Sequence, residues 1–109
     1  MAVYSIAEIR SRVADVAEKH GLKAVYLFGS YARGTATAES DVDLLVDISG
    51  AGIRSLLQLS ALLCDLEDAL GKRVDLVTTR SLEQPIRMPS DAYFRENLQR
   101  ERVEIYAVA

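Results

Sequence analysis

Two aspartates separated by a single valine, Asp41 and Asp43, stand at the start of an apolar run that continues to Val46. If this run is a β-strand, both carboxylates point to the same face, with their Cα atoms about 6–7 Å apart. Adjacent carboxylate oxygens suit Mg²⁺, which takes one or two carboxylates together with waters and substrate phosphates. For such a pair alone, a solvated polar face at a strand start is the better interpretation. Asp47 continues the same face, and we interpret it as a surface residue or as support for the pair.

A third aspartate, Asp75, lies in the middle of another apolar run, between Val74 and Leu76. A carboxylate buried there without a partner costs several kcal/mol, so Asp75 must be solvated, paired or beside a metal ion. Three carboxylates together can hold two Mg²⁺ ions about 3.5–4 Å apart, which clamp an in-line phosphoryl displacement. In this interpretation Asp41 and Asp43 bridge both ions, while Asp75 holds the ion beside the nucleophile and accepts its proton.

Gly29 and Ser30 follow an apolar segment directly and are typical of a turn that opens a helix. Glycine lets a phosphate approach the backbone, and the amides at a helix start favour an anion. Ser30 can add a hydroxyl hydrogen bond, and Arg33 in the same turn can contact a phosphate or hold the loop. Alone, the pattern equally fits an ordinary turn with a solvated arginine. It is not a Walker loop, since the Gly-Lys-Ser/Thr ending is absent.

The elements that position these residues alternate between helices and strands, which predicts an α/β sandwich with helices against a small sheet. A capping box at Ser5 and Glu8 opens the first helix, which ends at Gly21. In the second helix a stripe of leucines is predicted to pack in the core, with Cys64 as a small core residue. Strand order is not readable from the pattern. The predicted strands are residues 22–28, 42–48, 73–79 and 103–108; the second helix covers 53–70, with its stripe at Leu56, Leu59, Leu63, Leu66 and Leu70, and a last helix runs from Ser90 to about residue 100.

The composition narrows the possible functions. A length of 109 residues fits one domain, which we place at residues 1–109. The formal net charge of -3 argues against stable nucleic-acid binding through bulk electrostatics. One cysteine and one histidine exclude an internal disulfide and a histidine metal cluster. The N-terminus lacks a signal-peptide pattern and no apolar run reaches membrane-spanning length, so we expect a cytoplasmic protein without a membrane partner.

Taken together, the motifs resemble the DNA polymerase β-like nucleotidyltransferase superfamily. The resemblance rests on Gly29-Ser30 followed, after ten residues, by Asp41-Val42-Asp43, and on Asp75, which matches the third acidic position of the superfamily. The amino-acid sequence of residues 28–34 and 40–44 is similar to that of the smallest members, the minimal nucleotidyltransferase (MNT) proteins. The resemblance implies an α+β nucleotidyltransferase fold with a small mixed sheet packed with helices. It also assigns metal binding and catalysis to Asp41, Asp43 and Asp75, and nucleotide binding to Gly29, Ser30 and Arg33.

The same resemblance implies a function. MNT proteins are commonly antitoxins paired with a HEPN-domain ribonuclease toxin, and some transfer AMP from ATP onto a tyrosine of that toxin. We therefore expect an Mg²⁺-dependent enzyme, with ATP as substrate, that forms a hetero-oligomer with its toxin. All three acidic positions are intact, and we expect no extra substrate-gripping domain, which favours an acceptor delivered by a partner protein. Two alternatives stay open: an antitoxin that inhibits by binding alone, and a nucleotidyltransferase acting on a small molecule or RNA.

Overall fold

The computed structural model describes residues 3–79, 96 and 100–108. Its first long helix is capped by Ser5. This helix, α1, spans Ile6–His20. The Glu8 amide donates to the Ser5 hydroxyl and the Ser5 amide donates to the Glu8 carboxylate, each at 3.1 Å. Gly21 ends the helix with a left-handed backbone (φ 68°) that residues with a side chain resist. The helix predicted from the capping box is confirmed.

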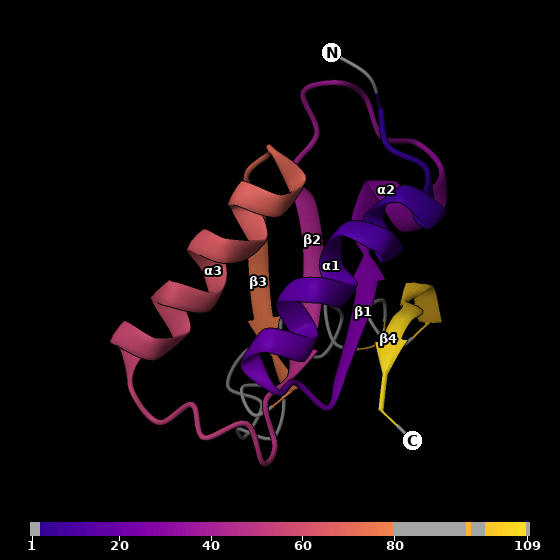
Figure 1. Cartoon of the computed structure of the whole chain (residues 1–109). Coiled ribbons are helices and arrows are strands. Elements are labelled where there is room, and N and C mark those ends of the chain that lie inside the picture. Colours follow the sequence, from indigo (N-terminus) through magenta and orange to yellow (C-terminus); the bar gives the residue numbers. More distant parts are fainter. Residues whose placement is uncertain (1–2, 80–95, 97–99, 109) are drawn as a thin grey trace.

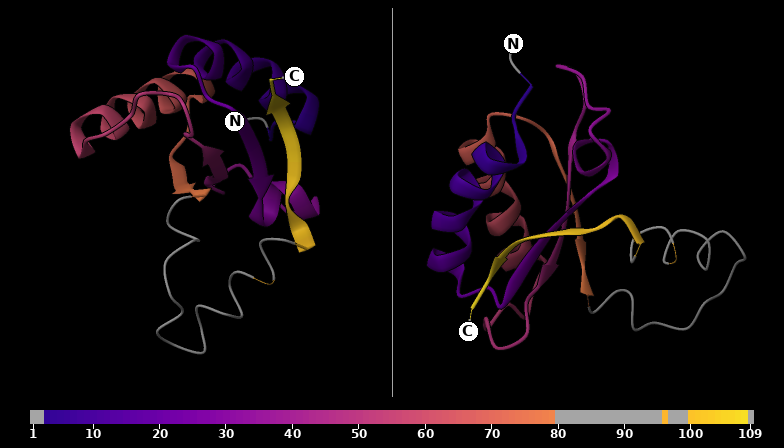
Figure 2. Two further views of the ribbon diagram at one scale, coloured as in Figure 1. Left: turned by 90° about the horizontal axis from the view of Figure 1, so that it is seen from below. Right: turned by 90° about the vertical axis from the view of Figure 1, so that its right-hand side faces the viewer.

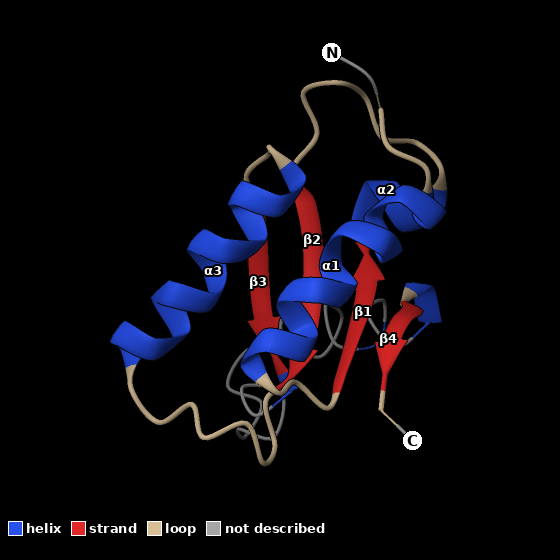
Figure 3. Cartoon of the chain, viewed as in Figure 1, coloured by secondary structure: helices blue, strands red, loops and turns tan. Residues whose placement is uncertain are grey.

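Four strands form one mixed sheet (Figures 1 and 3). In chain order they are β1 (Ala24–Phe28), β2 (Val42–Asp47), β3 (Val74–Thr78) and β4 (Val103–Ala107), and the short helix α2 (Gly29–Arg33) follows β1 directly. The spatial order is β3-β2-β1-β4; β1 runs antiparallel to β2 and β4, and β2 runs parallel to β3. The predicted class is confirmed, and the strand order is added to it.

These strand directions bring α2 and two connecting segments to the same end of the strands. Because β1 is antiparallel to β2 and β2 is parallel to β3, the end of β1 meets the beginnings of β2 and β3. At this end of the strands lie α2 and the segments that enter β2 and β3, as Figure 1 shows. The residues singled out for chemistry lie here: Gly29, Ser30 and Arg33 in α2, Asp41 just before β2, and Asp43 and Asp75 as the second residues of β2 and β3.

The helices cover one face of the sheet and form the core with it. The second long helix, α3, spans Leu56–Leu70, and Ser55 caps it by accepting the Gln58 amide at 3.2 Å. Figure 2 shows α1 and α3 side by side on the same side of the strands. Val42, Leu44 and Val46 of β2 point into this layer and are fully buried. Alternate residues of β2 consequently face the other side.

The leucine stripe predicted on α3 is partly wrong. Leu66 and Leu70 are fully buried as predicted, together with Leu62, which lay outside the stripe. Leu56 was expected in the core, but it is 79% exposed, and its neighbour Leu57 is 82% exposed. Figure 1 shows the reason: the first turn of α3 lies to the side of the strands and of α1, so nothing in the described residues covers it.

Two further expectations concern the same region and the chain end. Cys64 is exposed on α3, so its predicted place in the core is wrong. Of the helix predicted from Ser90 to about residue 100, the structure describes only residues 96 and 100, which are helical, and the other positions lie outside the described residues. Within the described part of the chain, no helix is long and apolar enough to cross a membrane.

Candidate active site

Asp43 and Asp75 are direct neighbours in the sheet. They are register partners in the parallel pair formed by β2 and β3, so their side chains share a face, and for Asp43 this is the face turned away from the long helices. Asp43 is half-buried, whereas Asp75 is exposed. Burial, the negative charges of Asp75 and Asp41, and a hydrogen bond with the Asp75 carboxyl group together raise the pKa of Asp43 from 3.8 to about 6, and Arg33 opposes the rise.

Asp41 lies at the rim of this pair. It precedes the first residue of β2 and is exposed, yet it is close enough for its charge to act on Asp43. Among the described residues, no three His, Cys, Asp or Glu side chains already converge as a cage for a metal ion. The structure thus brings Asp43 and Asp75 into contact and leaves Asp41 nearby.

The Asp43 carboxylate lies close to the Cα atom of Gly29. The Gly29 backbone has a φ of 74°, in the left-handed region that glycine adopts freely. A Cβ atom at this position would collide with the carboxylate of Asp43. The glycine at the start of α2 is therefore required twice, once by its backbone and once by the acidic side chain above it.

Ser30 and Arg33 lie in the same short helix and have different surroundings. Ser30 is half-buried in the first turn of α2, which no side chain caps within the described residues. Its carbonyl accepts the Thr35 amide at 2.9 Å, which closes the helix. Arg33 donates to Glu101 at 2.9 Å and is half exposed. No pattern in the sequence indicates this partner, which lies 68 residues further along the chain.

Asp47 provides an internal comparison for the acidic cluster. It lies on the same strand and the same face as Asp43, and its carboxylate accepts the Ser49 amide at 3.0 Å. Burial acts to raise its pKa, but the hydrogen bonds from Ser49 and the charge of Lys23 outweigh burial and lower it. The pKa values of two aspartates on one strand face are therefore shifted in opposite directions, because Asp43 is buried among other carboxylates whereas Asp47 accepts hydrogen bonds.

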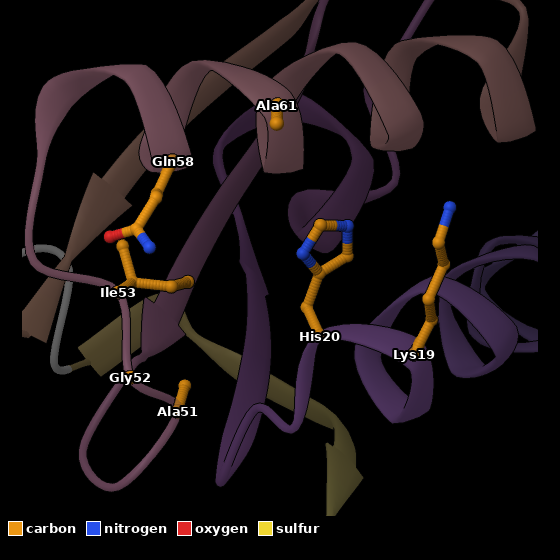
Figure 4. A pocket seen from close by; sticks show the side chains of 7 residues that line it. All are labelled: Lys19, His20, Ala51, Gly52, Ile53, Gln58 and Ala61. Carbon is orange, nitrogen blue, oxygen red and sulfur yellow. The ribbon is translucent and has the colours of Figure 1, made fainter.

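A hollow elsewhere on the molecule involves none of these residues. It lies between the end of α1, the loop before α3 and the first turns of α3, as Figure 4 shows. His20 points from α1 towards α3, where its Nε2 lies 2.7 Å from the Asp65 carboxylate. This contact accounts for the histidine as a link between the two long helices. The hollow is lined by Lys19, His20, Ala51, Gly52, Ile53, Gln58 and Ala61.

Comparison with known proteins identifies the family of this chain. A family model described as nucleotidyltransferase domain matches residues 9–105. The protein adenylyltransferase MntA of Thermococcus cleftensis is 42% identical over 90 residues, which cover 79% of this chain and 89% of that protein. The chain therefore belongs to the nucleotidyltransferase domain family, and the resemblance drawn from its motifs is confirmed.

Solved structures show the same fold. The structure of a protein proposed to be a minimal nucleotidyltransferase is 35% identical, with a TM-score of 0.66 over 94% of this chain and 98% of that one. A crystal structure of a toxin–antitoxin with AMP-PNP gives a TM-score of 0.68 at 23% identity, covering 91% of this chain and 73% of that one. The fold, with its small mixed sheet, is that of the polymerase β-like nucleotidyltransferases.

Proposed function

We propose that this chain transfers AMP from ATP to a hydroxyl group of a partner protein, in an Mg²⁺-dependent reaction that neutralises a HEPN-type toxin in the cytoplasm. The observation that carries the proposal is the contact of Asp43 with Asp75, above a glycine that leaves no room for a side chain. A fold has little reason to hold two carboxylates together unless a cation or proton joins them. The relative named a protein adenylyltransferase supports AMP as the transferred group.

The donor set fits magnesium. Asp41, Asp43 and Asp75 supply hard carboxylate oxygens, and burial together with the negative charges of Asp75 and Asp41 raises the pKa of Asp43. Bound Mg²⁺ would neutralise charge on the triphosphate and make the acceptor hydroxyl more acidic. The three aspartates would hold the metal, and exposed Asp75 would also take the proton of the acceptor hydroxyl.

The residues of α2 would hold the nucleotide. Gly29 and Ser30 begin this helix at the edge where the aspartates lie, so their backbone amides and the Ser30 hydroxyl are available for the phosphates. Arg33 is engaged with Glu101, which makes it a support for this segment as well as a cation near the site. A phosphate would have to compete with Glu101 for the guanidinium group.

The proposal of a toxin as partner is supported by the solved toxin–antitoxin complexes that share this fold. One of them contains a tri-AMPylated HEPN toxin in complex with an MNT antitoxin. Exposed Asp75 and exposed Asp41 leave the acceptor side of the site open, as delivery of the hydroxyl by another protein requires. We accordingly propose a hetero-oligomer in which the partner supplies the acceptor tyrosine.

The test uses ATP labelled at the α-phosphate, Mg²⁺ and the protein encoded beside this chain. We expect label on that neighbour with the wild type and with Asp47→Asn, which changes an aspartate on the same strand face outside the cluster. Asp41→Asn and Asp43→Asn should give no label. If neither the wild type nor any variant transfers label, and all of these proteins still neutralise the neighbour, the chain acts by binding alone. Label on RNA or on a small molecule instead of the neighbour would redirect the proposal to those acceptors.

A further inference from the structure

The segment that carries Asp41 is fastened at both ends to the two residues that lead into β3. At one end, the Lys72 ammonium donates to the Ala38 carbonyl at 2.6 Å. At the other end, the Val42 amide donates to the Arg73 carbonyl at 3.0 Å. Residues 38–42 are thus held against the chain just before Asp75, and the spacing between Asp41 and the neighbouring strand depends on both contacts.

The turn inside this segment is stiffened by its own hydrogen bonds. The Thr37 amide donates to the Ser40 hydroxyl at 2.8 Å, and the Ser40 amide donates to the Thr37 carbonyl at 3.0 Å. A turn closed in this way moves as one piece. A single side-chain contact at Ala38, in its middle, is therefore enough to fix where the whole turn lies, including the residue that follows it, Asp41.

Lys72 is unusual for a lysine in a turn between a helix and a strand. Such side chains ordinarily extend into water, because lysine is rarely buried. Here Lys72 is half-buried and donates to a backbone carbonyl. Its Nζ also lies 5.9 Å from the centre of the Tyr31 ring, and Tyr31 is only 4% exposed in α2. One ammonium group therefore contacts the turn before Asp41 and lies over the helix that begins with Gly29.

We infer that Lys72 is a positioning residue of the active site, which sets the turn carrying Asp41 against the strand carrying Asp75. The inference rests on the proposed function, since a defined spacing of these aspartates matters only where they hold a common ligand. Lys72 acts through the Ala38 carbonyl and takes no part in the chemical step. Removing its ammonium leaves the three aspartates in the chain but loosens the position of the first.

The test compares Lys72→Met, which keeps the length of the side chain and loses the ammonium, with Lys72→Arg, which keeps a cationic donor. Lys19→Met is the matched control, because the Lys19 ammonium makes its contact, an ion pair at 3.2 Å with Asp65, away from the aspartate cluster. Two quantities are measured on each protein: the Mg²⁺ concentration for half-maximal AMP transfer at saturating ATP, and the exchange rates of the Thr37 and Ser40 amide hydrogens without metal.

In Lys72→Met we expect the half-saturating Mg²⁺ concentration to rise about tenfold, as is common when a residue supporting metal ligands is lost. The rate at saturating Mg²⁺ should fall by less than about threefold, because a full complement of metal restores the arrangement. Both amide hydrogens should exchange faster. Lys72→Arg and Lys19→Met should stay close to the wild type in every measurement.

A folded Lys72→Met protein with unchanged Mg²⁺ dependence and unchanged exchange would overturn the inference and leave the proposed function intact. If the wild type transfers no AMP, the proposed function fails. Hydrogen exchange and Mg²⁺-dependent thermal shifts with a non-hydrolysable ATP analogue then still decide the role of Lys72. If the methionine variant does not fold, Lys72→Gln takes the same measurements. Wild-type Mg²⁺ dependence in a glutamine variant whose turn exchanges faster would likewise overturn the inference.

Discussion

Replacing Asp43 by asparagine should make the metal-free protein more stable at neutral pH, although it destroys the proposed site. Asp43 is held against Asp75 and near Asp41, and its pKa rises from 3.8 to about 6. A shift of this size nominally corresponds to about 3 kcal/mol of unfavourable free energy in the ionised native protein. Because the carboxyl group is only half-buried, solvent screening reduces the effect, and we expect about 1 kcal/mol. For a domain of this size, that amounts to about 4 °C in Tm.

The pH dependence of this gain has a definite sign. The folded-state pKa of Asp43 lies above the unfolded value, so the native protein binds the proton more tightly between about pH 4 and pH 6. Wild-type stability should therefore fall as the pH rises through this window. Asparagine does not ionise, so the advantage of Asp43→Asn should be absent near pH 4 and complete above about pH 7.

The assay is thermal unfolding followed by circular dichroism in EDTA at several pH values, and again with Mg²⁺ and a non-hydrolysable ATP analogue. A ligand at a hundred times its Kd stabilises the wild type by about 2.7 kcal/mol, and Asp43→Asn should lose this response. Asp47→Asn is the control of opposite sign, because hydrogen bonds from Ser49 lower the Asp47 pKa and its ionised form stabilises the fold at neutral pH. An Asp43→Asn protein that melts lower than the wild type at pH 7.5, or that still responds to the nucleotide, would refute the reasoning.

Three further predictions follow from the described contacts. Gly29→Ala should lower Tm and abolish nucleotide-dependent stabilisation, whereas Gly52→Ala, at a similar φ of 75° with open space around it, should show only the backbone strain. Leu66→Ala should cost about 2–5 kcal/mol in urea unfolding, while Leu57→Ala, at an 82% exposed position, should cost almost nothing; equal losses would contradict the assigned helix face. Asp65→Asn should lower Tm at pH 7 and leave it unchanged at pH 2, because hydrogen bonds from the histidine and lysine at the end of α1 lower the pKa of this carboxyl; a pH-independent loss would exclude the ion pair as its cause.

The parts of the fold that could be predicted depend on residues close together in the chain. The serine–glutamate capping box placed the start of α1, and Gly21 placed its end. The alternation in β2 correctly separated Leu44, which is buried against the helices, from Asp43 on the opposite face. Caps and alternation act over a few residues, so the pattern of side chains determines them without knowledge of the rest of the chain.

The parts that could not be predicted are contacts between distant segments. The sequence indicates two strands that contain Asp43 and Asp75, but not that these strands are parallel neighbours with the two aspartates in register. Nor does it indicate that Lys72 reaches the carbonyl of Ala38, 34 residues earlier in the chain. On α3 the failure is of another kind: Leu56 fits the apolar period, yet it lies where no described element packs on it. Periodicity reports which side chains are apolar, not how far the neighbouring elements extend.

The stability of the fold and the affinity of the site for a cation are two measures of one free energy. The register of β2 and β3 places Asp43 beside Asp75, and the Asp43 carboxylate occupies the space that a side chain at position 29 would need. In the metal-free protein, the burial of this carboxylate and the repulsion from its neighbours appear as a raised Asp43 pKa and a lower stability at neutral pH. A divalent cation that removes the repulsion recovers this free energy when it binds, so each loss of metal-free stability caused by the cluster should reappear as tighter metal binding. Variants that relax the cluster should therefore show an inverse relation: the higher the Tm in EDTA, the weaker the response to Mg²⁺ and nucleotide.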